Sequence, residues 1–276
     1  MHINFSRRVG AVAVAGVAVA ALAGAGAGYA AVTATAQPAI KTSTPHSAND
    51  VTNIDVLRQQ LRNYYGDPLG TGQFAATGNY AREASRVAAD GTRYLAQHRA
   101  HGRVTKAIVM DVDDTTLATW NYEIASNWAF NPTTNADYVL GEKFPPVPGM
   151  VAMATAAARE GYAVFYLTGR GSVQEDATLG NLTEKADYPK PTTLRGGEDG
   201  LFTKPDVTAY PAYLSTACAA DPGGKCTTIH YKSATRAHIE SLGYDIVANF
   251  GDQYSDLIGG HADRTFKLPN PNYFLP

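Results

Sequence analysis

The chain has 276 residues, of which 45% are hydrophobic and 17% are charged, and its net charge is −2. This is an ordinary globular composition, with room for one large domain or for a domain with a cap. A small acidic charge gives no electrostatic footprint for nucleic-acid polymers, so any affinity for phosphate groups must come from a local site.

Residues 1–36 are typical of a secretory signal peptide. Arg7 and Arg8 precede an Ala/Val/Gly-rich stretch over residues 9–32, and small residues follow it. A retained membrane anchor is the alternative, because the stretch is long enough to cross a bilayer. Ala and Gly gain little from lipid, so we expect cleavage, secretion and no stable anchor afterwards. The arginine pair also leaves twin-arginine export open.

The next part of the chain predicts a linker and two helices. Residues 37–50 are rich in Thr, Pro, Ser and Ala, which indicates a disordered linker. Residues 51–65 and 79–101 are predicted to be helical, because apolar and charged positions recur three and four apart and Gly102 stands where a helix would end.

A buried strand is predicted where an apolar run beginning at Ala107 ends in Asp111, Asp113 and Asp114. Open α/β sheets build their sites at the carboxyl ends of parallel strands. Clustered carboxylates repel one another, so this spacing suits a hard, oxygen-seeking cation such as Mg²⁺. A solvated acidic turn is the alternative.

About fifty residues separate this motif from the next, and both tryptophans of the chain lie among them. Trp120 and Tyr122 follow the acidic motif directly. Such aromatic residues either stack on the base or aryl leaving group of a substrate or form the core of a small cap. Residues 150–160 then predict a helix that leads into another strand, the β-α-β rhythm of a parallel sheet.

Three later apolar runs, each predicted as a strand, also end in residues with phosphate or metal chemistry. Residues 163–167 lead into Thr168-Gly169-Arg170, residues 227–231 lead into Lys232-Ser233, and residues 245–250 lead into a segment with Asp252 and Asp256. Between them, residues 172–187 predict a helix and residues 188–205 a Gly/Pro-rich loop.

Cys218 and Cys226 are the only cysteines, and they bracket a turn-forming segment. Two cysteines across a short loop of an exported protein predict a disulfide. A catalytic thiol is the alternative, but no nearby residue would activate one.

The four motifs in this order resemble the haloacid dehalogenase (HAD) superfamily of phosphotransferases. Finer detail resembles its acid phosphatase subfamily IIIB, which holds bacterial class C acid phosphatases and plant vegetative storage proteins. That detail is Leu-Thr-Gly-Arg at 167–170, Tyr-Lys-Ser at 231–233, Gly-Asp-Gln-Tyr-Ser-Asp-Leu at 251–257 and Phe-Lys-Leu-Pro-Asn-Pro at 266–271. The resemblance spans roughly residue 50 to the end.

The resemblance implies an α/β fold: a Rossmann-like HAD core with a parallel sheet and a small α-helical cap. The phosphatase domain would cover residues 51–276. Its cap would comprise about 51–103 and 118–147, and its core about 104–117 and 148–276. Lipid-anchored members carry a Cys just after the signal, and this chain has none there.

The resemblance also implies catalytic roles. Asp111 would be the nucleophile that forms an aspartyl-phosphate, and Asp113 would first protonate the leaving oxygen and then activate water. Thr168 and the neighbouring amide of Gly169 would hold a phosphoryl oxygen, while Lys232 would offset negative charge.

The implied cofactor is Mg²⁺. Its ligands would be the Asp111 carboxylate, the Asp113 backbone carbonyl and Asp252, with Asp256 as a further ligand or as a partner of one. No cysteine and histidine spacing indicates zinc.

The function predicted is that of a secreted, Mg²⁺-dependent acid phosphatase acting on small phosphomonoesters, with nucleoside monophosphates among the candidates. A phosphotransferase that passes the phosphoryl group to alcohols is one alternative, because water and alcohol compete for the same intermediate. A catalytically weak storage or binding protein is another, although the intact Asp111 favours an enzyme.

Overall fold

The computed structural model describes residues 44–98 and 104–275, and it has a five-stranded, all-parallel sheet at its centre. The predicted signal peptide lies outside these residues. The strand order is β3-β2-β1-β4-β5, with bounds of Thr105–Met110 (β1), Ala163–Gly171 (β2), Leu201–Lys204 (β3), Tyr244–Gly251 (β4) and Arg264–Lys267 (β5). Because β1 is central, the residue after it stands between the ends of β2 and β4, where open parallel sheets bind ligands.

The three central strands match the predicted apolar runs, whereas the two edge strands were not predicted. β1, β2 and β4 are buried almost throughout, as strands covered on both faces must be. β3 lies inside residues 188–205, where the sequence predicts a loop, and β5 was not assigned. Each has only four residues. A four-residue edge strand carries too short an apolar pattern to be distinguished from a loop.

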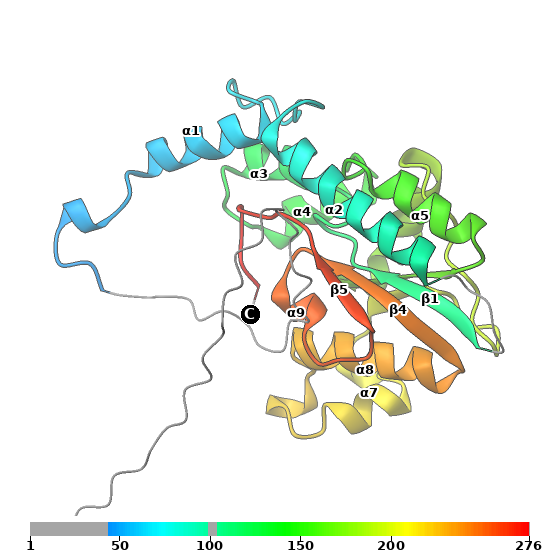
Figure 1. Cartoon of the computed structure of the whole chain (residues 1–276). Helices are drawn as coiled ribbons and strands as arrows, with labels where there is room; N and C mark the ends of the chain where they lie inside the picture. The colour runs from blue at the N-terminus through cyan, green and yellow to red at the C-terminus, as the bar shows by residue number, and fades with distance from the viewer. Residues whose placement is uncertain (1–43, 99–103, 276) are drawn as a thin grey trace, which may run out of the picture. The chain divides into compact units, whose positions relative to one another are not determined.

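Helices cover both faces of the sheet (Figure 1). α2 (Asn79–Gln97) and α5 (Met150–Arg159) pack with Ile108 and Met110, whereas α7 (Ala212–Ala217) and α8 (Thr228–Ser241) pack on the other face with Ala107 and Val109. Alternate residues of one strand point to opposite faces, so β1 alone supplies both halves of the core. The helical prediction for residues 79–101 is confirmed over Asn79–Gln97, and residues 99–101 lie outside the described residues. α2 packs on the sheet, while the division into cap and core remains a prediction.

The prediction of a strand over residues 227–231 is wrong, because these residues begin α8. Thr227 caps the helix, and its side chain accepts a hydrogen bond from the backbone N–H of His230 at 3.1 Å. The β-branched run of Thr and Ile favours a strand over five residues. Over a longer window the buried positions, such as Lys232, Thr235, Arg236 and Ile239, recur three and four apart, which is the helical period.

The insertion after β1 forms α3 (Trp120–Ser126) and α4 (Pro132–Leu140), and α1 (Ile54–Tyr65) precedes α2. Tyr65, Tyr80 and Trp120 form a separate buried group, the aromatic cluster, between α1, α2 and α3. The predicted helix over residues 172–187 is a succession of three helical segments. The remaining elements are η1 (Ala48–Asp50), η2 (Ser172–Gln174), α6 (Glu175–Gly180), η3 (Asn181–Lys185), η4 (Val207–Ala209), η5 (Pro222–Gly224) and α9 (Tyr254–Leu257).

The predicted disulfide is confirmed. Cys218, at the end of α7, is bonded to Cys226, just before α8, with Cα atoms 4.9 Å apart. Within residues 44–98 and 104–275, none of the helices has the length and apolar character needed to span a bilayer.

Candidate active site

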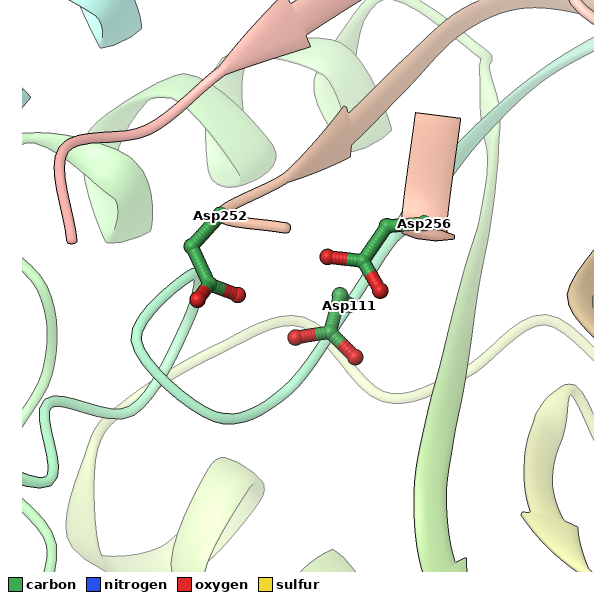
Figure 2. Close-up of side chains that lie close together, drawn as sticks. All are labelled: Asp111, Asp252 and Asp256. Carbon is green, nitrogen blue, oxygen red and sulfur yellow. The ribbon is translucent and has the colours of Figure 1, made fainter. Parts of the chain in front are cut away.

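Three carboxylates meet at the carboxyl edge of the sheet and form what we call the acidic cluster: Asp111, Asp252 and Asp256. Asp111 follows β1, Asp252 follows β4, and Asp256 lies in α9. One oxygen of each lies within 4.8 Å of the others, and all three residues are buried. Figure 2 shows the three side chains turned toward a common space. The fold therefore brings together carboxylates that are up to 145 residues apart.

Lys232 neutralises part of this charge from α8. Its ammonium donates to Oδ1 of Asp111 and to Oδ1 of Asp256, each at 2.5 Å. Burial opposes the charged ammonium, but the two carboxylates outweigh that effect and raise the pKa of Lys232 above its usual range, so it stays protonated. Lys232 therefore reaches the edge of the sheet from a helix and not, as the sequence predicted, from the end of a strand.

One ammonium does not balance three carboxylates. Burial raises the pKa of Asp111, and Asp256 and Asp252 add to the rise while Lys232 opposes it. Burial, with Asp256 and Asp114, also raises the pKa of Asp252 to about 7. Buried carboxylates that disfavour their own ionised form fit a divalent cation with oxygen ligands, because the cation would supply the missing positive charge.

Asp113 is not one of the three carboxylates of the acidic cluster, and it pairs with Arg170, just beyond Thr168 and Gly169 on β2. The guanidinium donates through Nε to Oδ2 at 3.0 Å and through Nη2 to Oδ1 at 2.7 Å. This two-bond pair fixes the plane of the carboxylate. The Asp113 side chain is 32% exposed, against 8% for Asp111, so it is the more accessible of the two.

Asp114 holds the loop that follows β1. Its carboxylate accepts hydrogen bonds from the backbone N–H of Thr119 at 2.9 Å and from the Thr119 hydroxyl at 2.5 Å. The residue is fully buried, and burial raises its pKa to about 7 although the Thr119 bonds oppose the rise. Asp114 therefore fixes the loop that carries Asp111 and Asp113.

Thr168 and Gly169 lie at the same edge of the sheet. The β1 and β2 register pairs Met110 with Tyr166, so Thr168 stands just beyond the level at which Asp111 leaves β1. Thr168 is buried, and its hydroxyl accepts a hydrogen bond from the backbone N–H of Arg170 at 3.2 Å. Gly169 is exposed. Their role in phosphate binding stays a prediction.

Trp120 does not lie where a leaving group could stack on it, which corrects that expectation. Its side chain is fully buried, its ring stacks on Tyr65 with centroids 4.0 Å apart, and its indole N–H donates to Oδ2 of Asp67 at 3.0 Å. Because both the ring face and the N–H are already engaged, Trp120 is a packing residue, the alternative that the sequence left open.

Tyr122 requires the same correction. The residue is 2% exposed, and its hydroxyl donates to the backbone carbonyl of Asn131 at 3.0 Å and accepts from the Asn131 N–H at 2.9 Å. Its ring packs edge-on against Tyr138. Tyr122 therefore joins α3 to α4 and has no surface left for a substrate.

Sequence reasoning missed four polar residues at the site. Arg170 and Asn270 belong to the quoted Leu-Thr-Gly-Arg and Leu-Pro-Asn-Pro segments but received no role, and Gln253 lies beside Asp252. Glu123, on α3, is 8% exposed and has neither a hydrogen-bond nor an ion-pair partner for its carboxylate among the described residues. Burial, with Asp113 nearby, raises its pKa to about 7. No sequence signal distinguishes Glu123 from a solvated helix residue.

Comparison with known proteins shows the family of the chain. The chain matches the family described as HAD superfamily, subfamily IIIB (acid phosphatase), over residues 29–276. It is 28% identical to the stem 28 kDa glycoprotein of Glycine max over 71% of this chain and 70% of that protein. It is 27% identical to acid phosphatase 1 of Solanum lycopersicum (71% and 69% covered) and 24% identical to vegetative storage protein 2 of Arabidopsis thaliana (83% and 77% covered).

Two solved structures of the class C acid phosphatase of Bacillus anthracis share the fold. The one with tungstate bound has a TM-score of 0.56 at 19% identity and covers 79% of this chain and 85% of its own. The other has a TM-score of 0.53 at 18% identity, with 72% and 80% covered. With the family match extending over most of the sequence, the chain belongs to the acid phosphatases of subfamily IIIB in the HAD superfamily and is a phosphomonoesterase.

Proposed function

We propose that this protein is an Mg²⁺-dependent acid phosphatase that hydrolyses small phosphomonoesters through an aspartyl-phosphate at Asp111. The observation that carries the proposal is the convergence of Asp111, Lys232, Asp252 and Asp256 at the end of the central strand, with Asp113 two residues further on. A buried carboxylate held by a lysine, next to an accessible carboxylate, supplies a nucleophile and a proton carrier within one loop.

In the first half-reaction an Asp111 carboxylate oxygen attacks phosphorus, and the bond from phosphorus to the leaving oxygen breaks. Asp113 gives its proton to that leaving oxygen, so the alcohol departs neutral. Lys232 holds Oδ1 of Asp111 and stabilises the negative charge that gathers on the transferring group. Thr168 and the amide of Gly169 bind a phosphoryl oxygen.

In the second half-reaction water attacks phosphorus and gives a proton to Asp113. The bond from phosphorus to the Asp111 oxygen breaks, which releases inorganic phosphate and restores the free carboxylate. Asp113 acts twice, first as acid and then as base, and its 32% exposed side chain can meet both the alcohol and the water. When Asp113 carries the proton it is neutral, so its two hydrogen bonds with Arg170 are then no longer assisted by opposite charges.

HAD enzymes use a divalent metal, and the acidic cluster supplies the ligands for one. Asp111, Asp252 and the backbone carbonyl of Asp113 would hold Mg²⁺, with Asp256 as a further ligand. Bound there, the ion would neutralise charge on the nucleophile and on the phosphoryl oxygens.

The substrate class and the cellular location are inferred from the family and from residues 1–36, and not from the acidic cluster. We infer small phosphomonoesters, with nucleoside monophosphates among them, and export directed by residues 1–36. The burial of Trp120 and Tyr122 removes the two rings that were expected to select an aromatic leaving group.

The test is phosphate release from p-nitrophenyl phosphate and a panel of nucleoside monophosphates, with Mg²⁺ or EDTA, by the wild type and by Asp111→Asn. Asp245→Asn is the matched control, because Asp245 lies near the opposite end of β4. We expect metal-dependent turnover in the wild type and the control, loss of at least about 10³-fold in Asp111→Asn, and a phosphorylated Asp111 peptide after acid quenching.

Absence of turnover on every ester, in folded and Mg²⁺-loaded protein, would exclude the phosphatase and favour a storage role like that named for the Arabidopsis relatives. Transfer of phosphate to added glycerol in preference to water would identify a phosphotransferase.

A further inference from the structure

The chain after β5 returns to the active-site edge of the sheet. We call residues 268–275 the C-terminal segment. It begins with Leu268, which is fully buried and donates its backbone N–H to the carbonyl of Gly251 at 2.9 Å, at the very end of β4. The next residue after Gly251 is the cluster ligand Asp252. In Figure 1 this segment is the red chain that leaves β5. Its first residue therefore lies next to the residue that precedes Asp252.

Asn270, in this segment, hydrogen-bonds directly to a member of the acidic cluster. Its side-chain amide donates to Oδ2 of Asp252 at 2.7 Å, and it reaches Oδ2 of Asp114 at 3.4 Å. The amide of Gln253 donates to the same Oδ2 of Asp252 at 2.7 Å. Two amide donors therefore occupy Oδ2, whereas Oδ1 has only a longer contact, 3.2 Å from the Thr115 hydroxyl. This arrangement leaves Oδ1 as the oxygen available to a cation.

Asn270 is itself held in place by its surroundings. Its Oδ1 accepts the backbone N–H of Asn272 at 2.9 Å, which orients the amide N–H groups toward Asp252. Asn272 in turn donates to the Tyr65 hydroxyl at 2.8 Å and accepts from the Trp128 indole at 3.3 Å. The C-terminal segment thus joins Asp252 to the helices that carry the aromatic cluster.

We propose that Asn270 is a positioning residue of the metal site, which fixes the Asp252 carboxylate so that Oδ1 meets the cation. The inference rests on the proposed function, since it takes Asp252 as a metal ligand. A carboxylate that loses an orienting donor can rotate. Binding a cation must then fix its orientation, and the lost conformational entropy weakens the affinity. Asn272 lies two residues away, and its side chain hydrogen-bonds to Tyr65 and Trp128 and to no carboxylate of the acidic cluster. Replacing Asn272 therefore tests whether loosening of the C-terminal segment alone weakens metal binding.

The experiment is titration of EDTA-stripped protein with MgCl₂ by isothermal calorimetry, for the wild type, Asn270→Ala, Asn272→Ala and Asp252→Asn. We expect Asn270→Ala to raise the Kd for Mg²⁺ about 10- to 100-fold, the usual effect of removing a partner of a metal ligand. Asn272→Ala should change it by no more than about threefold. At saturating Mg²⁺, the KM for p-nitrophenyl phosphate should be the same in wild type and Asn270→Ala.

Wild-type metal affinity in Asn270→Ala, beside impaired binding in Asp252→Asn, would overturn the inference and leave the proposed function standing. An equal loss of affinity in the two asparagine variants would also overturn it, since loosening of the segment would then be the cause. Wild-type affinity in Asp252→Asn would refute the metal role of Asp252 and the inference with it. If Asn270→Ala does not fold, Asn270→Leu has nearly the wild-type volume without the donor, and the same Kd limits apply to it.

Discussion

The acidic cluster and the aromatic cluster are both buried, and both lie beside the loop after β1, but different interactions hold their residues together. Tyr65, Tyr80 and Trp120 stack on one another, with ring centroids 4.0 Å apart for Tyr65 and Trp120 and 4.4 Å for Tyr65 and Tyr80. Such packing stabilises the fold without any partner from outside. In the acidic cluster Lys232 forms ion pairs with Asp111 and Asp256, and Asp252 has amide donors instead of a cation, so the burial of these carboxylates costs folding free energy.

This difference separates buried groups that stabilise the fold from buried groups that bind a ligand. A group whose neighbours satisfy it, as Asp67 satisfies the Trp120 indole, needs nothing further. A cluster that lacks positive charge is expected only where a ligand completes it. This contrast makes distinct predictions for variants of the two regions, beginning with those of largest effect.

Lys232→Met should have the largest effect, because it leaves Asp111 and Asp256 buried without their counter-charge. We expect a loss of about 3–5 kcal/mol in unfolding free energy at pH 8 in EDTA and a fall in kcat of at least about 10³-fold. Mg²⁺ should raise the Tm of the variant more than that of the wild type. Urea unfolding and p-nitrophenyl phosphate assays measure both effects. Lys106→Met, at the far end of β1, is the control, and equal stability of the two variants would contradict the prediction.

Trp120→Ala should damage stability without changing the handling of substrate. Removing a fully buried indole from a stacked cluster should cost about 3–5 kcal/mol, whereas KM for a nucleoside monophosphate should stay within about twofold of the wild type in folded protein. Thermal unfolding and steady-state kinetics measure the two quantities. A variant of normal stability with a strongly raised KM for nucleotides would restore Trp120 as a leaving-group contact.

Glu123 lies on the same helix as Trp120, but its carboxyl group interacts electrostatically with Asp113. Its carboxyl pKa rises from 4.5 to about 7 in the folded protein because of burial and Asp113. The folded state therefore holds a proton that the unfolded state releases, so the wild-type unfolding free energy should fall as pH rises from 4.5 to 7. The fall attributable to Glu123 is about 3 kcal/mol, constant above pH 7.

Glu123→Gln has no such proton, so its stability advantage over the wild type should grow across that pH window. Urea unfolding in EDTA at pH 4.5, 6 and 7.5 measures it, with Glu160→Gln, a change at an exposed carboxyl, as the control. Parallel pH curves for the wild type and Glu123→Gln would show that the Glu123 carboxyl is not buried in the way described.

The Cys218–Cys226 bond touches neither cluster, so its loss should have the smallest effect and only on stability. The chain-entropy cost of its short loop predicts a decrease of about 2–3 kcal/mol when both cysteines are replaced by alanine. The kcat of the folded variant should remain within about twofold of the wild type. A large loss of kcat would mean that the bond positions Lys232 through the start of α8.

The residue pattern alone predicts which polar side chains meet at the candidate active site. Asp111, Thr168 and Asp252 each follow a buried apolar run, and the carboxyl ends of parallel strands share one edge of a sheet, so local pattern and topology together place them. The disulfide was equally predictable, because its two cysteines lie eight positions apart.

The pairing of these side chains, in contrast, depends on the packing of the folded chain. Lys232 donates to the acidic cluster from a helix, Asp113 accepts hydrogen bonds from Arg170, and the Trp120 ring stacks on Tyr65. Each of these contacts joins segments far apart in the chain, and each depends on the depth at which one element packs against another. Residue spacing carries no information about that depth, because it records neighbours along the chain and not across the fold.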